Sequence, residues 1–370
     1  MSLTVAHLTS AHPRFDHRIF SKECLSLLRF GYRVKLIVAD GLGNESRQGI
    51  EIFDVGVSSG RLSRILMATR RIFFKAQQLD CDLYHIHDPE LIPVGFRLLR
   101  LGKKVIFDSH EDVPTQLRQK VYLNKTFMRG VSFLYSIFQK IVLRKFSFLI
   151  AATPRIKEKL AKISSKVEDV CNFPLKDELT PCSFRNERQK SACYVGGMCE
   201  IRGLKEMIES GNFLLPGVKI RFAGKFFDSN LEEEFLKNCS EKFEFLGFLD
   251  RDGVKDLFEN SSAGLVVLHP VENYIEALPV KLFEYMAAGL PVIASDFPIW
   301  KDIVEGNQCG LCVDPLNPKE IAVAINTLME SPEMAREMGD NGRTAIEMRY
   351  NWQNEEEKLL SIYKNVLNGF

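Results

Sequence analysis

The chain has 370 residues, which is long for one hydrophobic core and suits two domains of about 150 to 200 residues each. Its 45% hydrophobic and 26% charged residues exclude an intrinsically disordered protein. No apolar run approaches the roughly 20 residues that span a bilayer, and the N-terminus leads directly into a strand pattern rather than a signal peptide. We therefore expect a cytoplasmic, globular protein.

The first half of the chain alternates β-branched runs with amphipathic stretches. The runs predict strands at 3–9, 34–38, 83–87, 105–107 and 148–151. Helical patterns lie between them at 18–30, 62–79 and 91–101. Because this alternation is typical of parallel strands joined by crossover helices, we predict a doubly wound α/β domain over residues 1–172.

A basic segment lies within this first domain. Residues 113–157 contain no acidic residue and carry nine positive charges, so the rest of the chain has a net charge of −8 within a total of +1. Aromatic and aliphatic residues lie between the cations. Two interpretations stay open. The segment binds an anionic membrane surface, where each cation contributes about 1 kcal/mol, or it is a helix with an ordinary solvated basic face.

The alternation lapses after residue 172 and then returns. Residues 173–190 are mostly polar and predict a linker, with prolines at 174 and 181. Strand patterns follow at 192–195, 218–222, 243–246, 264–268 and 292–294, separated by helical patterns at 204–209, 231–239, 254–259 and 282–288. A second Rossmann-like domain is predicted over 191–351, and a final helix over 352–370. Since ligands bind beyond the carboxyl ends of such strands, we expect a cleft shared by the two domains.

The segment 273–298 carries the strongest candidate chemistry. Pro279 lies near the start of a predicted helix, whose backbone N–H groups and positive dipole end suit a diphosphate. Lys281 offers a point charge for phosphate, and Glu284 can accept two hydrogen bonds from a ribose diol. Glu276, eight residues earlier, can reach sugar hydroxyls. A capped helix with two solvated glutamates explains the same residues equally well.

His110 follows the predicted strand 104–107, at the carboxyl end where a cleft residue is expected. Acidic residues at 108, 111 and 112 surround it. His85 and His87 compete for the same cleft and rank second, because alternate strand residues point one way and His85 fits a core position.

Metal binding is not predicted. The acidic pairs of the triplets 80–82 and 250–252 have the spacing that holds Mg²⁺ or Mn²⁺ on a diphosphate, but both triplets lie at turns. The nine cysteines indicate reduced thiols, and Cys309 and Cys312 lack the further ligands of a zinc site.

In order along the chain, these motifs resemble retaining glycosyltransferases of family 4, which have the GT-B fold. The matching segments are 10–16, 87–90, 108–112, 172–174, 194–197, 245–247 and the E-x7-E segment from Glu276 to Glu284. They are similar to the branch found in polysaccharide, O-antigen and capsule gene clusters. The resemblance implies an α/β architecture of the GT-B type, in which two Rossmann-like doubly wound domains face a central cleft. It also implies that the final helix crosses back to the first domain.

The resemblance also assigns roles. Glu284 matches the ribose-binding glutamate, while Glu276 and His110 match residues that face the transferred sugar. The pattern departs from the family at one point, because Pro279 lies five residues before Glu284 rather than three. Glu284 is therefore the safer assignment.

The diphosphate clamp of the family is altered here. Gly197 occupies the position of the usual arginine, and Arg202, followed by Gly203, matches the usual lysine and becomes the main expected cation. Further residues are expected to bind the donor, namely Asn273, Leu278 and Lys281. A possible acceptor or phosphate loop comprises Arg14, Asp16, Arg18 and His87.

The implied function is retaining transfer of a hexose-type sugar from a nucleotide diphosphate sugar, most often a UDP-sugar, to a lipid-linked or glycan acceptor. No metal and no cofactor beyond the donor is expected, and no nucleic acid partner. The basic block places the protein at the inner face of the cell membrane. Two alternatives stay open, an epimerase of GT-B fold and a non-catalytic binding or scaffold subunit, the latter suggested by Gly197.

Overall fold

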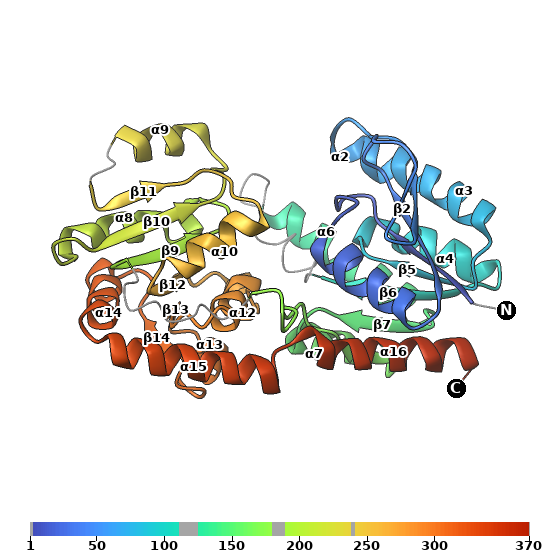
Figure 1. Ribbon diagram of the computed structural model, residues 1–370. Coiled ribbons are helices and arrows are strands. Elements are labelled where there is room, and N and C mark those ends of the chain that lie inside the picture. Colours follow the sequence, from blue (N-terminus) through green and yellow to red (C-terminus); the bar gives the residue numbers. More distant parts are fainter. Residues whose placement is uncertain (1–2, 111–124, 180–188, 238–240, 370) are drawn as a thin grey trace. The chain divides into compact units, whose positions relative to one another are not determined.

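The computed structural model describes residues 3–110, 125–179, 189–237 and 241–369, and its ribbon is drawn in Figure 1. The chain forms two compact units. Unit 1 comprises Met1–Asn172 and Trp352–Phe370, and unit 2 comprises Phe173–Asn351. The sequence pattern ends the first predicted domain at residue 172 and starts the final helix at residue 352. Within the described residues, no helix is long and apolar enough to cross a membrane.

Unit 1 is built on a sheet of eight described strands. Its order is β3-β4-β2-β1-β5-β6-β7-β8, and every pair is parallel except β3 with β4. The sheet changes direction of winding between β1 and β5, which creates the switch point where ligands of such folds bind. The strands are β1 (Thr4–Leu8), β2 (Arg33–Val38), β3 (Glu45–Arg47), β4 (Ile50–Asp54), β5 (Leu83–Ile86), β6 (Lys104–Ser109), β7 (Phe148–Ala151) and β8 (Val167–Asp169).

Helices cover both faces of this sheet. Asp16 starts η1 by accepting hydrogen bonds from the backbone N–H groups of Arg18 and Ile19. The final helix α16 packs on η1, and the indole N–H of Trp352 donates to Ser26 Oγ at 3.0 Å. The helices are η1 (His17–Cys24), α1 (Leu25–Arg29), α2 (Gly60–Ser63), η2 (Arg64–Ala68), α3 (Thr69–Leu79), η3 (Pro89–Leu91), α4 (Ile92–Arg100), α6 (Lys125–Leu143), α7 (Pro154–Ala161) and α16 (Trp352–Asn368).

Unit 2 repeats the doubly wound plan with parallel strands throughout its described sheet. The order β11-β10-β9-β12-β13-β14 is that of a dinucleotide-binding Rossmann fold, and it confirms the predicted α/β class. Its switch point lies between β9 and β12. The strands are β9 (Ser191–Val195), β10 (Lys219–Ala223), β11 (Phe243–Phe245), β12 (Ala263–Val266), β13 (Val292–Ser295) and β14 (Gly310–Val313).

The helices of unit 2 cover its sheet. Part of the predicted linker 173–190 also belongs to this unit. Phe173 is buried with its ring 4.7 Å from that of Phe283, so the start of 173–190 is packed rather than extended; 180–188 lie outside the described residues. The helices are η4 (Glu200–Arg202), α8 (Leu204–Ser210), η5 (Gly211–Phe213), α9 (Ser229–Lys237), α10 (Arg251–Glu259), α11 (Glu272–Ile275), α12 (Val280–Ala287), α13 (Pro298–Val304), α14 (Pro318–Glu330) and α15 (Pro332–Met348).

Candidate functional site

A glycine-rich loop follows β9 at the switch point of unit 2. A Cβ atom on Gly197 would lie 2.5 Å from the ring of Phe227, and one on Gly203 would lie 1.9 Å from the carbonyl oxygen of Val267. Gly203 also has φ of +74°, which side chains rarely adopt. The loop therefore needs glycine at position 203, and at position 197 a side chain would displace the exposed ring of Phe227. It brings its backbone close to the neighbouring groups, as phosphate-binding loops do.

Two cationic side chains meet at this loop. The ammonium of Lys281, from the first turn of α12, is 3.8 Å from the ring centroid of Tyr194 and would be 3.0 Å from a Cβ atom on Gly196. Arg202 donates from Nη1 to the carbonyl oxygen of Gly197 at 3.4 Å. The structure thus brings the predicted residues Gly197, Arg202 and Lys281 together.

Lys281 is the most unusual of these groups. Its Nζ is buried and has no hydrogen-bond acceptor within the described part of the chain. Burial lowers the pKa of Lys281 to about 7, and the positive charge of Arg202 lowers it further, while Glu284 opposes the shift. A buried amine without a partner is rare unless it serves a site that a ligand completes.

Glu284 lies in the middle of α12 with its side chain largely buried. Arg251 donates to Glu284 Oε1 from Nη1 at 2.7 Å and to Glu178 from Nε at 2.8 Å. The guanidinium therefore fixes the orientation of the carboxylate. Arg251 is the middle residue of the 250–252 triplet. The sequence analysis considered only the two acidic residues of this triplet. Asp250 caps α10 by accepting from the N–H of Gly253 at 2.9 Å.

A pocket of about 290 Å³ opens beside the glycine loop, at the carboxyl ends of β9 and β10. Phe227 and Phe248 form aromatic walls, and the ammonium of Lys225 lies 4.7 Å from the ring centroid of Phe248. Aromatic walls beside a cationic loop suit a planar base joined to phosphates. Sequence analysis missed both phenylalanines, whose local signal is only their position shortly after a strand.

The predicted donor residues Asn273, Glu276 and Leu278 lie on one segment that leads into α12. Asn273 is in α11, Glu276 follows its last turn, and Leu278 precedes Pro279. Trp300 anchors the segment by donating from Nε1 to the carbonyl oxygen of Ala277 at 2.8 Å. Pro279 provides no side-chain cap for α12, and the N–H of Leu282 donates to the carbonyl oxygen of Pro279 at 3.0 Å, so the remaining N–H groups of this first turn suit an anion.

In unit 1, His110 lies at the carboxyl end of β6. Its Nε2 is 3.0 Å from Asp108 Oδ2, and its side chain is 18% exposed. Burial alone would raise the pKa of Asp108, but the charges of Arg18 and His110 outweigh burial and hold it well below its ordinary value. An ionised carboxylate therefore orients the imidazole, while the acidic neighbours at 111 and 112 lie outside the described residues.

The expectation that Arg14 and Arg18 supplement the phosphate clamp is not supported. Arg14 is buried and donates to Asp40 at 2.7 and 2.8 Å, to the carbonyl oxygen of Gly43 and to Glu45. Arg18 is buried and donates to Asp108 and to the carbonyl oxygen of Val170. Both guanidinium groups are thus committed within unit 1, and Asp16 serves as the cap of η1.

His87 also differs from the sequence interpretation, because it is buried rather than accessible. Burial lowers the pKa of His87 to about 4, although Asp108 acts in the opposite direction. It lies in a cluster with His7, His85 and Glu23, described below. His85 is buried as well, in agreement with its expected core position.

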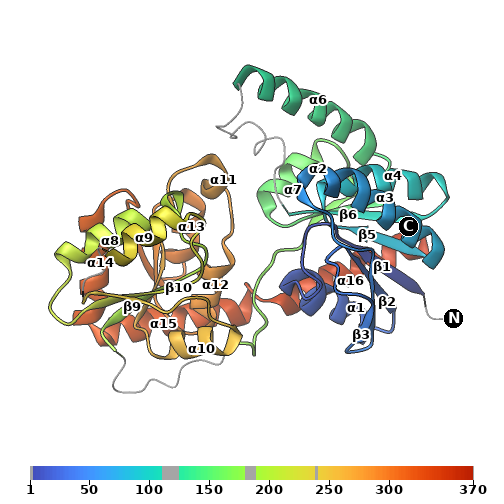
Figure 2. The same ribbon diagram turned by 90° about the horizontal axis from the view of Figure 1, so that it is seen from above.

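The basic block coincides in part with α6, while its residues 113–124 lie outside the described structure. Figure 2 shows α6 at the surface of unit 1, with its far end away from the other helices of that unit. Exposed apolar side chains recur along it at helical spacing, and they are Phe133, Leu134, Ile137, Phe138 and Ile141. A basic helix packed on its own sheet usually buries its apolar side chains, whereas these five are exposed in unit 1.

Family models match both units of the chain. The model "Glycosyl transferases group 1" matches residues 176–345, and the model "Glycosyltransferase Family 4" matches residues 24–173. The Spore coat protein SA of Bacillus subtilis (strain 168) is 27% identical over 188 residues, which are 48% of this chain and 49% of that protein. The match thus spans about half the length of that curated relative.

Solved structures share the whole architecture. The sucrose-phosphate synthase from Thermosynechococcus elongatus superposes with a TM-score of 0.80 at 16% identity, covering all of both chains. Anabaena Alr3699/HepE, in complex with UDP-glucose, superposes with a TM-score of 0.74 at 13% identity over 98% of this chain and all of that one. At identities this low, the superpositions establish the fold alone, and it is the predicted GT-B fold.

Proposed function

Since the chain has the GT-B fold and models of glycosyltransferases match both of its units, we propose that it transfers a sugar from a nucleotide diphosphate sugar to an acceptor. One observation carries the proposal. The buried ammonium of Lys281 lacks an acceptor among the described groups and lies with Arg202 at a glycine loop, beside a pocket with aromatic walls. A diphosphate joined to a flat base matches both features.

In the proposed complex, the diphosphate binds Lys281, Arg202 and the N–H groups of the glycine loop. Glu284, held by Arg251, accepts hydrogen bonds from the ribose diol, and the base enters the pocket beside Phe248. We propose a UDP-sugar as the donor. The complex of Anabaena Alr3699/HepE with UDP-glucose supports this choice through the shared fold.

The chemical step is proposed to proceed with retention and without a metal on the diphosphate. The two cations at the loop stabilise the negative charge that develops on the leaving phosphate, which is the work that a divalent ion does in other transferases. Asp250 of the 250–252 triplet has a structural role instead, because it caps α10. His110 and Glu276 stay predicted contacts of the transferred sugar.

Incubation with a panel of nucleotide sugars and lipid-linked acceptors tests the function. We expect release of UDP from one UDP-sugar only when an acceptor is present, and unchanged rates in EDTA. An epimerised donor without acceptor would instead establish the epimerase. Absence of both binding and turnover across the panel would indicate a scaffold subunit. Nuclear magnetic resonance of the product determines its anomeric configuration.

We further propose that the exposed face of α6 binds an anionic membrane and thereby reaches a lipid-linked acceptor at the inner face of the cell membrane. Leu62, Leu66 and Met67, in α2 and η2, are further exposed apolar residues of unit 1, with Arg64 and Arg70 close in sequence. Apolar side chains with neighbouring cations suit the boundary between acyl chains and anionic headgroups.

Vesicle sedimentation tests this surface. We expect the wild type to bind vesicles that contain phosphatidylglycerol. The double variant Phe133→Glu with Leu134→Glu should bind at least about tenfold more weakly, because its two carboxylates replace apolar area that would enter the membrane and repel the anionic headgroups. Met348→Glu, at an exposed apolar position of unit 2, is the matched control. Equal binding of both variants and the wild type would contradict the proposal.

A further inference from the structure

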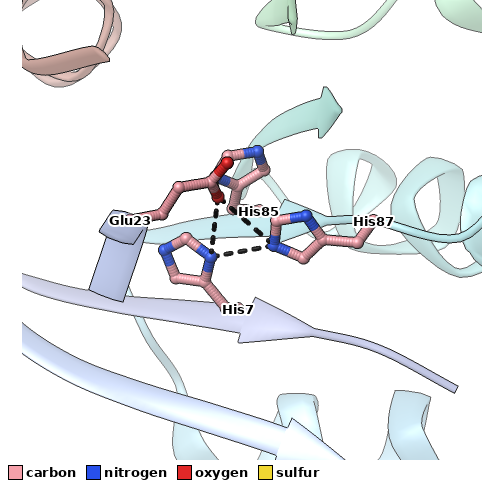
Figure 3. Close-up of side chains that lie close together, drawn as sticks. All are labelled: His7, Glu23, His85 and His87. Carbon is pink, nitrogen blue, oxygen red and sulfur yellow. Dashed lines mark hydrogen bonds and ion pairs between the residues drawn. The ribbon is translucent and has the colours of Figure 1, made fainter. Parts of the chain in front are cut away.

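A cluster of four buried side chains lies on one face of the sheet of unit 1 (Figure 3). His7 in β1 is level with His85 in β5, and His87 follows two residues later, so all three imidazoles are on the same face. Glu23 enters from η1. Each of the four side chains is at most 1% exposed.

The donor atoms of the cluster surround a common centre. Glu23 Oε2 is 3.7 Å from His7 Nδ1, 3.8 Å from His85 Nδ1 and 3.8 Å from His87 Nε2. His7 Nδ1 and His87 Nε2 are 2.9 Å apart, and all four atoms lie within 4.8 Å of one another. A tetrahedral zinc ion with bonds of about 2.0 to 2.1 Å separates its ligands by about 3.3 to 3.4 Å. Small side-chain shifts therefore bring the four atoms to coordination distance.

This core holds two carboxyl groups beside one guanidinium group. Glu23 and Asp108 are buried carboxylates, and Arg18 is the buried guanidinium that contacts both of them. Neither oxygen of Glu23 receives a hydrogen bond of normal geometry from a described group. Uncompensated burial of a carboxylate is strongly unfavourable, and a bound cation would relieve it.

Two of the histidines have partners on their second ring nitrogen. The hydroxyl of Tyr363, from α16, lies 3.2 Å from His7 Nε2, and Asp108 lies 3.6 Å from His87 Nδ1. Such partners on the second ring nitrogen orient histidine ligands in metal sites.

From this geometry we propose that His7, Glu23, His85 and His87 bind one zinc ion in the core of unit 1. Because all four ligands come from the protein, the site is closed and structural. The ion joins β1, β5 and η1, and it replaces the 2.8 Å contact between His85 Nδ1 and the hydroxyl of Tyr363. The proposal departs from the sequence expectation of no metal, and it is independent of the proposed transferase function and of the diphosphate.

Metal analysis of the full chain, with any affinity tag removed, tests the site. We expect about one zinc per chain by plasma mass spectrometry, and a visible absorption band of tetrahedral cobalt after exchange with Co²⁺. Glu23→Gln keeps the size of the side chain but removes the anionic ligand, so zinc content should fall at least about tenfold. His269→Asn is the matched control, because His269 pairs with Glu206 in unit 2, and it should leave zinc content unchanged.

The wild-type protein provides a second readout that needs no variant. After removal of metal with a chelator, added zinc should raise the melting temperature by several degrees, since it binds only the folded state tightly. A wild-type chain that holds no zinc, gives no cobalt band and melts at the same temperature with and without zinc would overturn the proposal. The cluster would then be a hydrogen-bonded histidine network with a protonated Glu23.

Discussion

Replacement of Glu284 by glutamine is expected to lower kcat/KM by about 10² to 10³ while the fold stays intact. The carboxylate can accept two charge-assisted hydrogen bonds from the ribose, and each such bond contributes about 1.5 to 3 kcal/mol. The amide that replaces it accepts through one oxygen only. It also loses the ion pair with Arg251, which remains partly exposed and paired with Glu178, so the loss of stability should be small. Steady-state kinetics with the active donor measures the effect.

Glu244→Gln is the control for this substitution, because Glu244 pairs with Arg221 on the same unit without touching the loop or the pocket. Its kinetics should match the wild type. If Glu284→Gln keeps wild-type kcat/KM and wild-type affinity for UDP, the ribose assignment is wrong. A variant with normal UDP affinity but low kcat would instead move Glu284 from binding to the chemical step.

The sequence predicted the architecture well because parallel strands and crossover helices leave strong periodic signals. The central strands of both sheets coincide with the predicted apolar runs. The edge strands β3 and β8, and β4 between β3 and β2, escaped prediction, since these short strands bury few residues and show little pattern. β14 (Gly310–Val313) also escaped prediction, since it is short and lies at the other edge of the unit 2 sheet.

The structure brings predicted site residues together where they belong to a local motif, and it departs from the sequence analysis where tertiary packing decides. Lys281 and Glu284 are on one helix, and the structure places Arg202 beside Lys281. The partner of Glu284, Arg251, lies 33 residues away in sequence and could not be identified from spacing. Arg14 and Arg18 were misassigned because a sequence does not show that a loop arginine turns inward to buried carboxylates.

The histidine cluster shows the same limit in another form. His85 and His87 are two apart on a strand, which indicates a common face, but His7 and Glu23 join them only through the pairing of β1 with β5 and the docking of η1. A sequence search for zinc ligands looks for short spacings. It therefore finds Cys309 and Cys312, two thiols whose pKa values burial raises to about 12, and misses the four residues that converge in space.

Substitution of Lys281 by methionine should separate stability from function. Because the pKa of Lys281 falls from 10.5 in the unfolded chain to about 7 in the fold, its burial opposes folding by on the order of 3 to 5 kcal/mol below pH 7. Between pH 7 and 10.5 the unfolded state binds more protons, so wild-type stability rises with pH in this window. Lys281→Met should therefore unfold at higher denaturant concentration than the wild type at pH 6, and the difference should shrink toward pH 10.

The same substitution should lower kcat by about 10² to 10³, since it removes a cation from the leaving phosphate. Calorimetry in buffers of different ionisation enthalpy gives a sharper test. At pH 8 the amine of the wild type is mostly neutral, and a bound diphosphate favours its protonated form, so binding of UDP should take up close to one proton. At pH 6 the amine is already protonated and the uptake due to it should vanish. Lys225→Met, at the pocket wall, keeps Lys281 and should preserve the uptake at pH 8. Binding of UDP without proton uptake at pH 8 would show that the diphosphate does not meet Lys281, even if transfer itself is observed.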